Sequence, residues 1–152
     1  MYGATGTYML GSFDGKTFIP ESGKYFYTKG SLYAGQTYTN IPNSDGRRIQ
    51  IAWGRISHPS MPFNGMMLLP TELTLHTTKE GIRLFSNPIK ETKQLFTPLK
   101  KWASLTSDKA NDHLKEFRNA ETLRIKTTFK LSHATSAGID LFGQRILDYD
   151  MN

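Results

Sequence analysis

The sequence contains no cysteine among its 152 residues, so disulfide bonds, thiolate catalysis and cysteine-based metal sites are excluded. No apolar run approaches the roughly 20 residues of a membrane-spanning helix, and we expect no membrane partner. The excess of basic over acidic residues is small, 19 against 13. The basic residues are scattered and form no motif typical of nucleic-acid-binding proteins, so we expect no nucleic-acid partner.

The sequence also lacks residues at metal-ligand spacing and a recognisable targeting signal. We expect neither a metal nor a cofactor, because no ligand spacing relates the four histidines, His58, His76, His113 and His133. The first residues have neither the basic nor the apolar region of a secretory signal peptide. The compartment in which the protein works stays open, since the lack of cysteine does not decide it.

Residues 1–87 have the pattern of a β-rich segment. The alternation over residues 47–53 predicts a strand with Ile49, Ile51 and Trp53 on one face and residues 48, 50 and 52 on the other. A turn cluster at 40–46 precedes this strand, and a hairpin is expected over 73–85. Further strands are expected over 7–13, before the Asp14-Gly15 turn, and over 31–39. Short strands at this density are typical of propellers and sandwiches.

The pattern changes over residues 88–119. A short helix is expected with Asn87 as its N-cap and Pro88 at its first position, and residues 107–117 form either a second helix or a solvated loop. From residue 121 the β pattern returns. Residues 123–130 alternate as in a half-buried strand, and residues 137–149 are expected to form a hairpin around Gly143. The predicted fold class is mainly β, with a short helical connector.

Four motifs follow one another in residues 11–73. Residues 11–18 read GSFDGKTF, 33–40 read YAGQTYTN, 47–53 read RRIQIAW and 69–73 read LPTEL. In this order they resemble glycoside hydrolase family 32, the fructan hydrolases that include invertases, levanases and inulinases. Two positions depart from the usual family residues, because Ala52 stands where a glycine is common and Thr71 where an arginine is common.

The resemblance implies a fold. It predicts the final blade of a five-bladed β-propeller, followed by a linker and part of a β-sandwich. On this interpretation residues 1–87 are the propeller-blade segment, residues 88–119 are a connector with short helices, and residues 120–152 are a partial β-sandwich. The resemblance also implies that the parent enzyme is a retaining β-fructosidase.

The catalytic motifs of the resembled family do not occur in this sequence. A retaining glycosidase needs two carboxyl groups about 5–5.5 Å apart, one as nucleophile and one as acid/base. The family carries its nucleophile in a W-M-N-D-P-N-G motif, a further aspartate in R-D-P and its acid/base glutamate in E-C. None of these is present, and Asp14 and Asp45 sit in Asp-Gly turns that explain them. We therefore assign no catalytic residue and expect the chain to be inactive alone.

Trp53 is the one candidate substrate-binding residue. The resemblance implies that this tryptophan lines the wall of the fructose pocket, where an aromatic face suits the apolar side of a sugar and the indole N–H adds a donor. The alternative is a core tryptophan on a buried strand face. Tyr33 and Tyr38 are expected to be packing residues.

Three functions stay open on the sequence. The first is a fragment of a fructan- or sucrose-cleaving glycoside hydrolase, whose partners are its substrate and the missing N-terminal propeller half. The second is a non-catalytic carbohydrate-binding β module. The third is a structural or oligomerising remnant that self-associates through open strand edges and uncovered apolar faces.

Overall fold

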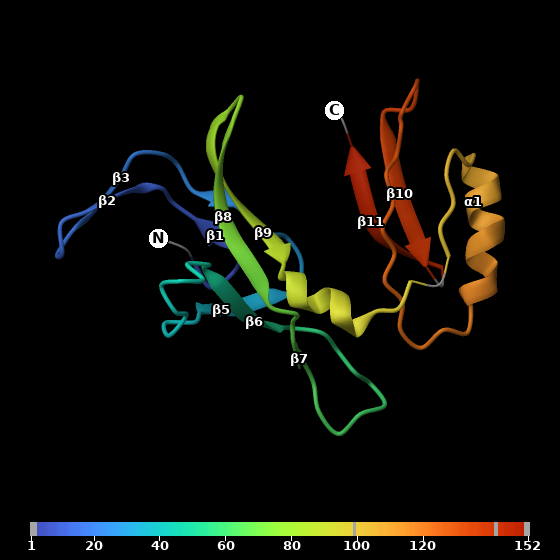
Figure 1. Ribbon diagram of the computed structural model, residues 1–152, viewed down its shortest axis with the longest axis horizontal. Helices are drawn as coiled ribbons and strands as arrows, with labels where there is room; N and C mark the ends of the chain where they lie inside the picture. Colours follow the sequence, from blue (N-terminus) through green and yellow to red (C-terminus); the bar gives the residue numbers. More distant parts are fainter. Residues whose placement is uncertain (1–2, 99, 142, 151–152) are drawn as a thin grey trace. The chain divides into compact units, whose positions relative to one another are not determined.

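The computed structural model describes residues 3–98, 100–141 and 143–150. The chain forms two compact units, Met1–Leu95 and Phe96–Asn152. Both contain β-strands, and all helical segments lie between Lys90 and Phe117 within the described residues. The predicted mainly β fold with helix confined to residues 88–119 is therefore confirmed (Figure 1). In the part of the chain that the structure describes, no helix is both long and apolar enough to cross a membrane.

The first unit holds nine strands and one 3-10 helix in the described range. They are β1 (Thr7–Tyr8), β2 (Gly11–Phe13), β3 (Phe18–Pro20), β4 (Tyr25–Phe26), β5 (Leu32–Thr37), β6 (Ile49–Gly54), β7 (Met66–Met67), β8 (Thr71–Thr78), β9 (Gly81–Pro88) and η1 (Lys90–Leu95). The strand expected over 7–13 is divided into β1 and β2, which pair with different partners. Pro88 ends β9 and does not begin a helix, which starts two residues later.

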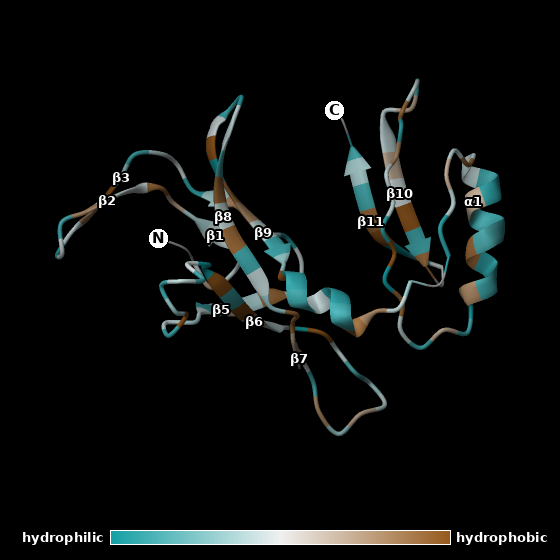
Figure 2. Ribbon diagram, viewed as in Figure 1, coloured by the Kyte–Doolittle hydropathy of each residue, from teal (hydrophilic) through white to brown (hydrophobic). Residues whose placement is uncertain are grey.

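An antiparallel sheet forms the centre of this unit. Its strands follow the order β5-β6-β8-β9, and β7 pairs with the end of β6. Four antiparallel strands in this simple succession have the form of one blade of a β-propeller. Hydrophobic and hydrophilic residues alternate along β8 in Figure 2, as expected of a strand with two different faces. The few buried apolar side chains in the described residues include Ile49, Ala52 and Leu73 of this sheet.

Two short ribbons precede the sheet. In the β2–β3 turn the Asp14 carboxylate accepts the backbone N–H groups of Lys16 and Thr17, each at 2.7 Å, and these bonds lower the pKa of Asp14. The turn role predicted for Asp14 is thereby confirmed. The β1–β4 ribbon reaches the sheet through Tyr8, whose buried hydroxyl accepts the backbone N–H of Leu84 in β9 at 3.1 Å.

Arg47 connects the turn before β6 with the segment after β9 through ion pairs. Its guanidinium donates to Asp45 at 2.6 Å and to Glu91 of η1 at 3.0 Å. The hydrogen bonds from Arg47 are the main cause that lowers the pKa of Asp45 to about 2. Asp45 therefore stabilises a turn, as the sequence predicted.

The second unit contains α1 (Ser107–Leu114), η2 (Lys115–Phe117), β10 (Ser136–Leu141) and β11 (Gln144–Asp150). Of the two possibilities for residues 107–117, the helix is correct, and its N-cap is Thr106. Trp102 stacks on His113 of α1 with ring centroids 4.8 Å apart. The hairpin predicted around Gly143 is also confirmed, although Phe142 itself lies outside the described residues.

The strand predicted over residues 123–130 is wrong. This segment has no regular secondary structure, and Phe129 is 47% exposed. An alternating pattern becomes a strand only when a neighbouring strand takes up its backbone N–H and C=O groups. Within the described residues of this unit, β10 and β11 pair only with each other. The segment therefore has the alternating pattern of a strand, but no strand of the described residues pairs with it.

Candidate functional site

Trp53 lies near the end of β6, between two neighbouring strands. It is in register with Tyr33 of β5 on one side and with Met67 of β7 on the other. It is 40% exposed in this structure, whereas the core alternative expects a buried ring. The Tyr33 ring meets the indole edge-on, with centroids 6.2 Å apart and planes at 69°. An accessible aromatic face on a rigid strand can stack against an apolar ligand surface.

Gly65 sets the position of the indole ring. A Cβ on Gly65 would lie 2.0 Å from Nε1 of Trp53, so the ring rests directly against this backbone. Gly65 also has a φ of +77°, a conformation that residues with a side chain adopt at a cost. Its N–H donates to the Ile56 carbonyl at 2.8 Å and closes the loop between β6 and β7. Glycine is therefore required here both by the backbone and by the ring.

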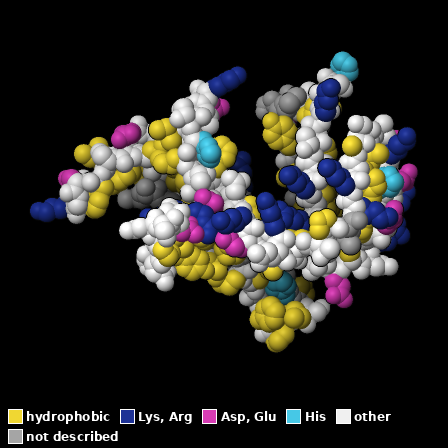
Figure 3. Space-filling model, in the orientation of Figure 1, with side chains coloured by type: hydrophobic (Ala, Val, Ile, Leu, Met, Phe, Trp, Pro, Cys, Tyr) yellow, Lys and Arg dark blue, Asp and Glu magenta, His cyan; other side chains and the backbone are white. Residues whose placement is uncertain are grey.

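The loop between β6 and β7 surrounds the site with further groups. The Arg55 guanidinium lies over the Tyr33 ring, 4.9 Å from its centroid. Within the loop the His58 N–H donates to the Asn64 side chain at 3.2 Å, and the His58 ring packs against Phe63. Figure 3 shows hydrophobic side chains gathered on this loop, which projects from the sheet.

Sequence reasoning missed Arg55 and Gly65. Arg55 lies two residues after Trp53, and the same alternation that placed Trp53 would have placed it on the same face. Gly65 follows Asn64, and an Asn-Gly pair is a strong turn signal. Tyr33 was expected to be a packing residue. It packs against Trp53, yet it is itself partly exposed on this surface.

The electrostatic environment of several carboxyl groups is clear in the described residues. A general acid at neutral pH needs a raised pKa. The carboxyl groups for which a shift is resolved all have lowered pKa values, because each accepts hydrogen bonds from backbone N–H groups, arginine or lysine; they are Asp14, Asp45, Glu91, Asp112 and Glu116. Likewise, no group of three or more potential metal ligands occurs in the described ranges.

Sequence comparison supplies the family. The model of the glycosyl hydrolases family 32 N-terminal domain matches residues 2–88. A levanase of Bacillus subtilis (strain 168) is 29% identical over 141 residues, which cover 86% of this chain and 20% of the levanase. A levanase of Bacillus sp. (strain L7) is 36% identical over 72 residues, which cover 44% of this chain and 8% of that protein.

These matches agree with the motifs and with the sheet. The chain spans only a small part of the length of these curated relatives, a fifth in the longer match. The family model covers more than half of the chain and includes the blade-like sheet together with Trp53. The chain belongs to glycoside hydrolase family 32.

Proposed function

We propose that this chain is part of a levanase-like β-fructosidase that cleaves fructans or sucrose, and that it has no hydrolytic activity by itself. The observation that carries the proposal is the match of residues 2–88 to the N-terminal domain of family 32. The two levanase relatives favour fructan as the substrate. The lack of the three carboxylate motifs in the sequence supports inactivity of the chain alone.

In this proposal the domain organisation follows the sequence interpretation. Residues 1–87 are the propeller-blade segment, residues 88–119 the connector and residues 120–152 a partial β-sandwich. The antiparallel sheet of the first unit supports the first assignment, and the β10–β11 hairpin is in keeping with the last. The catalytic carboxylates come from a propeller half that is the partner of this chain.

Trp53 is the residue that we propose to touch substrate. In the assembled enzyme its exposed indole forms one wall of the fructose pocket and stacks against the apolar side of the sugar. Three observations support this role. The ring is accessible, its orientation is set by Gly65, and Tyr33 supports it from the side.

A chimeric enzyme tests the Trp53 role. The matched 86% of this chain replaces the equivalent segment of the Bacillus subtilis levanase, and the chimera is expected to cleave levan. Trp53→Ala in the chimera is expected to lower kcat/KM for levan about tenfold or more, since a sugar-stacking face is lost. Steady-state kinetics measure the change.

Trp102→Phe is the matched control, because it alters the other tryptophan, in the second unit, and keeps a ring there. A chimera with a cooperative melting transition but no levan hydrolysis contradicts the proposed function. A chimera that cleaves levan equally well with and without Trp53 contradicts the role of this residue alone.

A second candidate function is self-association, and the exposed apolar surface favours it. On one face of the β8–β9 hairpin Leu75 is 58% exposed and Ile82 is 49% exposed. On the other face Phe85 is exposed as well. Apolar groups of this size on a sheet favour pairing with another surface, either the missing propeller half or a second copy.

We expect the purified chain to form oligomers whose fraction rises with concentration. Multi-angle light scattering across a concentration series measures this. The double change Leu75→Thr and Ile82→Thr keeps β-propensity but removes apolar surface, and it is expected to shift the distribution toward monomer. Thr77→Ser, on the same hairpin, is the matched control. A monomeric mass at every concentration contradicts self-association.

A further inference from the structure

Arg55 presents an unpaired guanidinium beside Trp53. Its backbone N–H donates to the Ser31 carbonyl at 2.9 Å, so the pairing of β5 with β6 extends one residue beyond Gly54. Because side chains alternate along an extended chain, Arg55 lies on the same face as Trp53, about 6.6 Å further along. Within the described residues the guanidinium contacts the Tyr33 ring and takes part in no ion pair. Its N–H donors are therefore available to a ligand.

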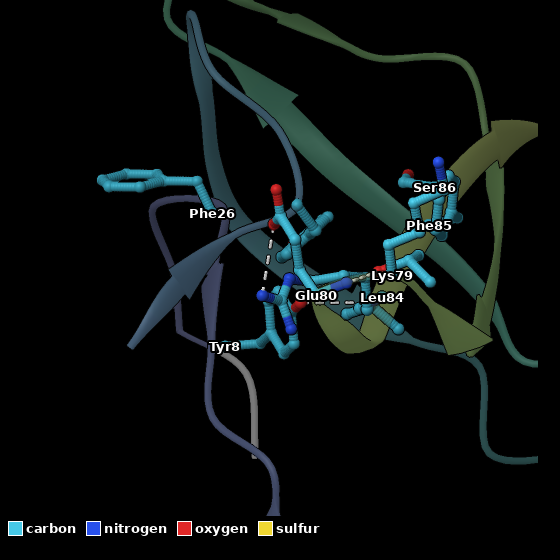
Figure 4. Close-up of a pocket in the computed structure, with 10 residues that line it drawn as sticks. Tyr8, Phe26, Lys79, Glu80, Leu84, Phe85 and Ser86 are labelled. Carbon is cyan, nitrogen blue, oxygen red and sulfur yellow. Dashed lines mark hydrogen bonds and ion pairs between the residues drawn. The ribbon is translucent and has the colours of Figure 1, made fainter. Parts of the chain in front are cut away.

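A second stacked arginine provides a contrast. Arg83 lies over the Tyr25 ring, 4.3 Å from its centroid, much as Arg55 lies over its own tyrosine. Arg83 lines a hollow together with Glu80 (Figure 4), and it donates to the Glu80 carboxylate at 3.3 Å and to the Ile82 carbonyl at 3.0 Å. In the part of the chain that the structure describes, Arg83 thus has acceptors and Arg55 has none.

A β-bulge in β5 places Tyr33 on the face of Trp53. The step from Tyr33 to Gln36 on β5 spans only two residues of β6, because the register shifts between them. A regular strand turns residues three apart to opposite faces, whereas the bulge keeps both on one face. Ala34, inside the bulge, has a φ of +50°, which is an uncommon and strained conformation for a residue with a side chain. The strand therefore departs from regular geometry where it presents Tyr33 to Trp53 and Arg55.

The bulge is held from the opposite face of the sheet. The Gln50 side chain is buried there, and its Nε2 donates to the Tyr27 hydroxyl at 2.9 Å. A Cβ on Gly35 would clash with this nitrogen, so glycine lets the amide lie against the bulge. Because the backbone is fixed in this way, the orientation of Tyr33 is set before a ligand arrives, which lowers the entropic cost of binding.

The exposed side chains match the chemistry of a saccharide. The Trp53 indole offers a flat apolar face that can stack on the C–H side of a sugar ring. The Arg55 guanidinium offers a planar set of N–H donors, which suits two neighbouring oxygen atoms such as those of a vicinal diol. Tyr33 contacts both side chains and fixes their spacing. That spacing along the strand is close to the length of one sugar unit, so the two side chains can reach successive units of a chain.

We infer that Arg55 is a specificity-determining residue, which donates hydrogen bonds to hydroxyl groups of the sugar unit next to the one stacked on Trp53. The ligand is a neutral saccharide of at least two units. Its identification as a fructan rests on the proposed function, whereas the arrangement of Arg55, Tyr33 and Trp53 does not. Arg55 favours linked sugar units over a single sugar and takes no part in bond cleavage.

NMR titration of the intact, ¹⁵N-labelled chain with fructose and with the β-2,6-linked fructose disaccharide tests the inference. The Trp53 indole N–H signal is expected to shift with both sugars, because both have a ring that can stack. The Arg55 Nε–H signal is expected to shift and saturate with the disaccharide alone. The disaccharide is therefore expected to bind roughly five- to tenfold more tightly than fructose.

Two substitutions separate recognition of the second sugar from a general effect of charge. Arg55→Gln and Arg55→Lys are each expected to remove the gain in affinity and to leave the affinity for fructose unchanged. The lysine keeps the charge and its attraction to the Tyr33 ring but loses the planar fork of donors. Arg83→Gln is the matched control, since Arg83 is also stacked on a tyrosine, and it is expected to change neither affinity.

The unaltered chain decides the inference without any variant. An Arg55 signal that responds to fructose as it does to the disaccharide overturns it, and so does a saturating response to acetate alone, which assigns the guanidinium to a carboxylate partner. An Arg55→Gln variant that loses affinity for both sugars equally shows that Arg55 only supports the Tyr33 ring. Sugars that move no signal show that this chain has no such site, while the chimera tests the proposed function separately.

Discussion

The purified chain is expected to release no fructose or glucose from levan, inulin or sucrose above the buffer blank. Retaining hydrolysis needs a carboxylate nucleophile and a carboxylic acid about 5–5.5 Å apart, and loss of either removes the reaction pathway. The sequence carries none of the three family motifs that supply these groups. The carboxyl groups with resolved shifts, such as Asp45 and Glu91, have lowered pKa values and are unsuited to act as a general acid.

A sensitive assay for reducing sugar measures this expectation on protein from a host strain that lacks invertase. The same preparation from cells with the empty vector is the control for traces of host enzyme. Activity that coelutes with the chain through two different columns, and that changes when Trp53 is replaced by alanine, would show that the chain supplies its own catalytic groups. The proposed division of the enzyme would then be wrong.

Gly65→Ala is expected to lower the free energy of unfolding of the first unit by roughly 2–4 kcal/mol and to move the Trp53 ring. About 1–3 kcal/mol of this comes from holding alanine at a φ of +77°, and the rest from the clash of its Cβ with the indole. The loop between β6 and β7 is expected to loosen, because Gly65 closes it by its bond to Ile56. Chemical denaturation measures the free energy of unfolding.

Gly15→Ala is the matched control for this prediction. Gly15 also has a positive φ, +98°, but a Cβ there would meet no atom within 4 Å. Alanine at position 15 therefore carries the same kind of cost for a positive φ as alanine at position 65, but its Cβ makes no steric clash. Tryptophan fluorescence, excited selectively in a Trp102→Phe background so that Trp53 is the only tryptophan, is expected to shift for Gly65→Ala and not for Gly15→Ala. Equal stability losses with unchanged fluorescence would show that Gly65 does not position the ring.

Local signals predicted most of the first unit. Asp14 lies in the expected turn because a short carboxylate can accept the N–H groups that follow it, and this needs no distant partner. The β8–β9 hairpin forms where Lys79 and Glu80 interrupt two apolar alternating segments. The prediction is wrong at residues 123–130, where the alternation is equally clear but no strand of the described residues pairs with the segment.

The sequence by itself determined the family, through four ordered motifs. It also determined that Gln50 and Trp53 lie on opposite faces of their strand, because side chains alternate with a period of two residues. It did not determine which of those faces is covered. Only the tertiary structure decided that Gln50 is buried and Trp53 exposed, because burial depends on segments far away in the chain, such as Tyr27, Gly35 and Gly65. The physical reason is that alternation is a property of one strand, whereas burial is a property of everything that packs against it.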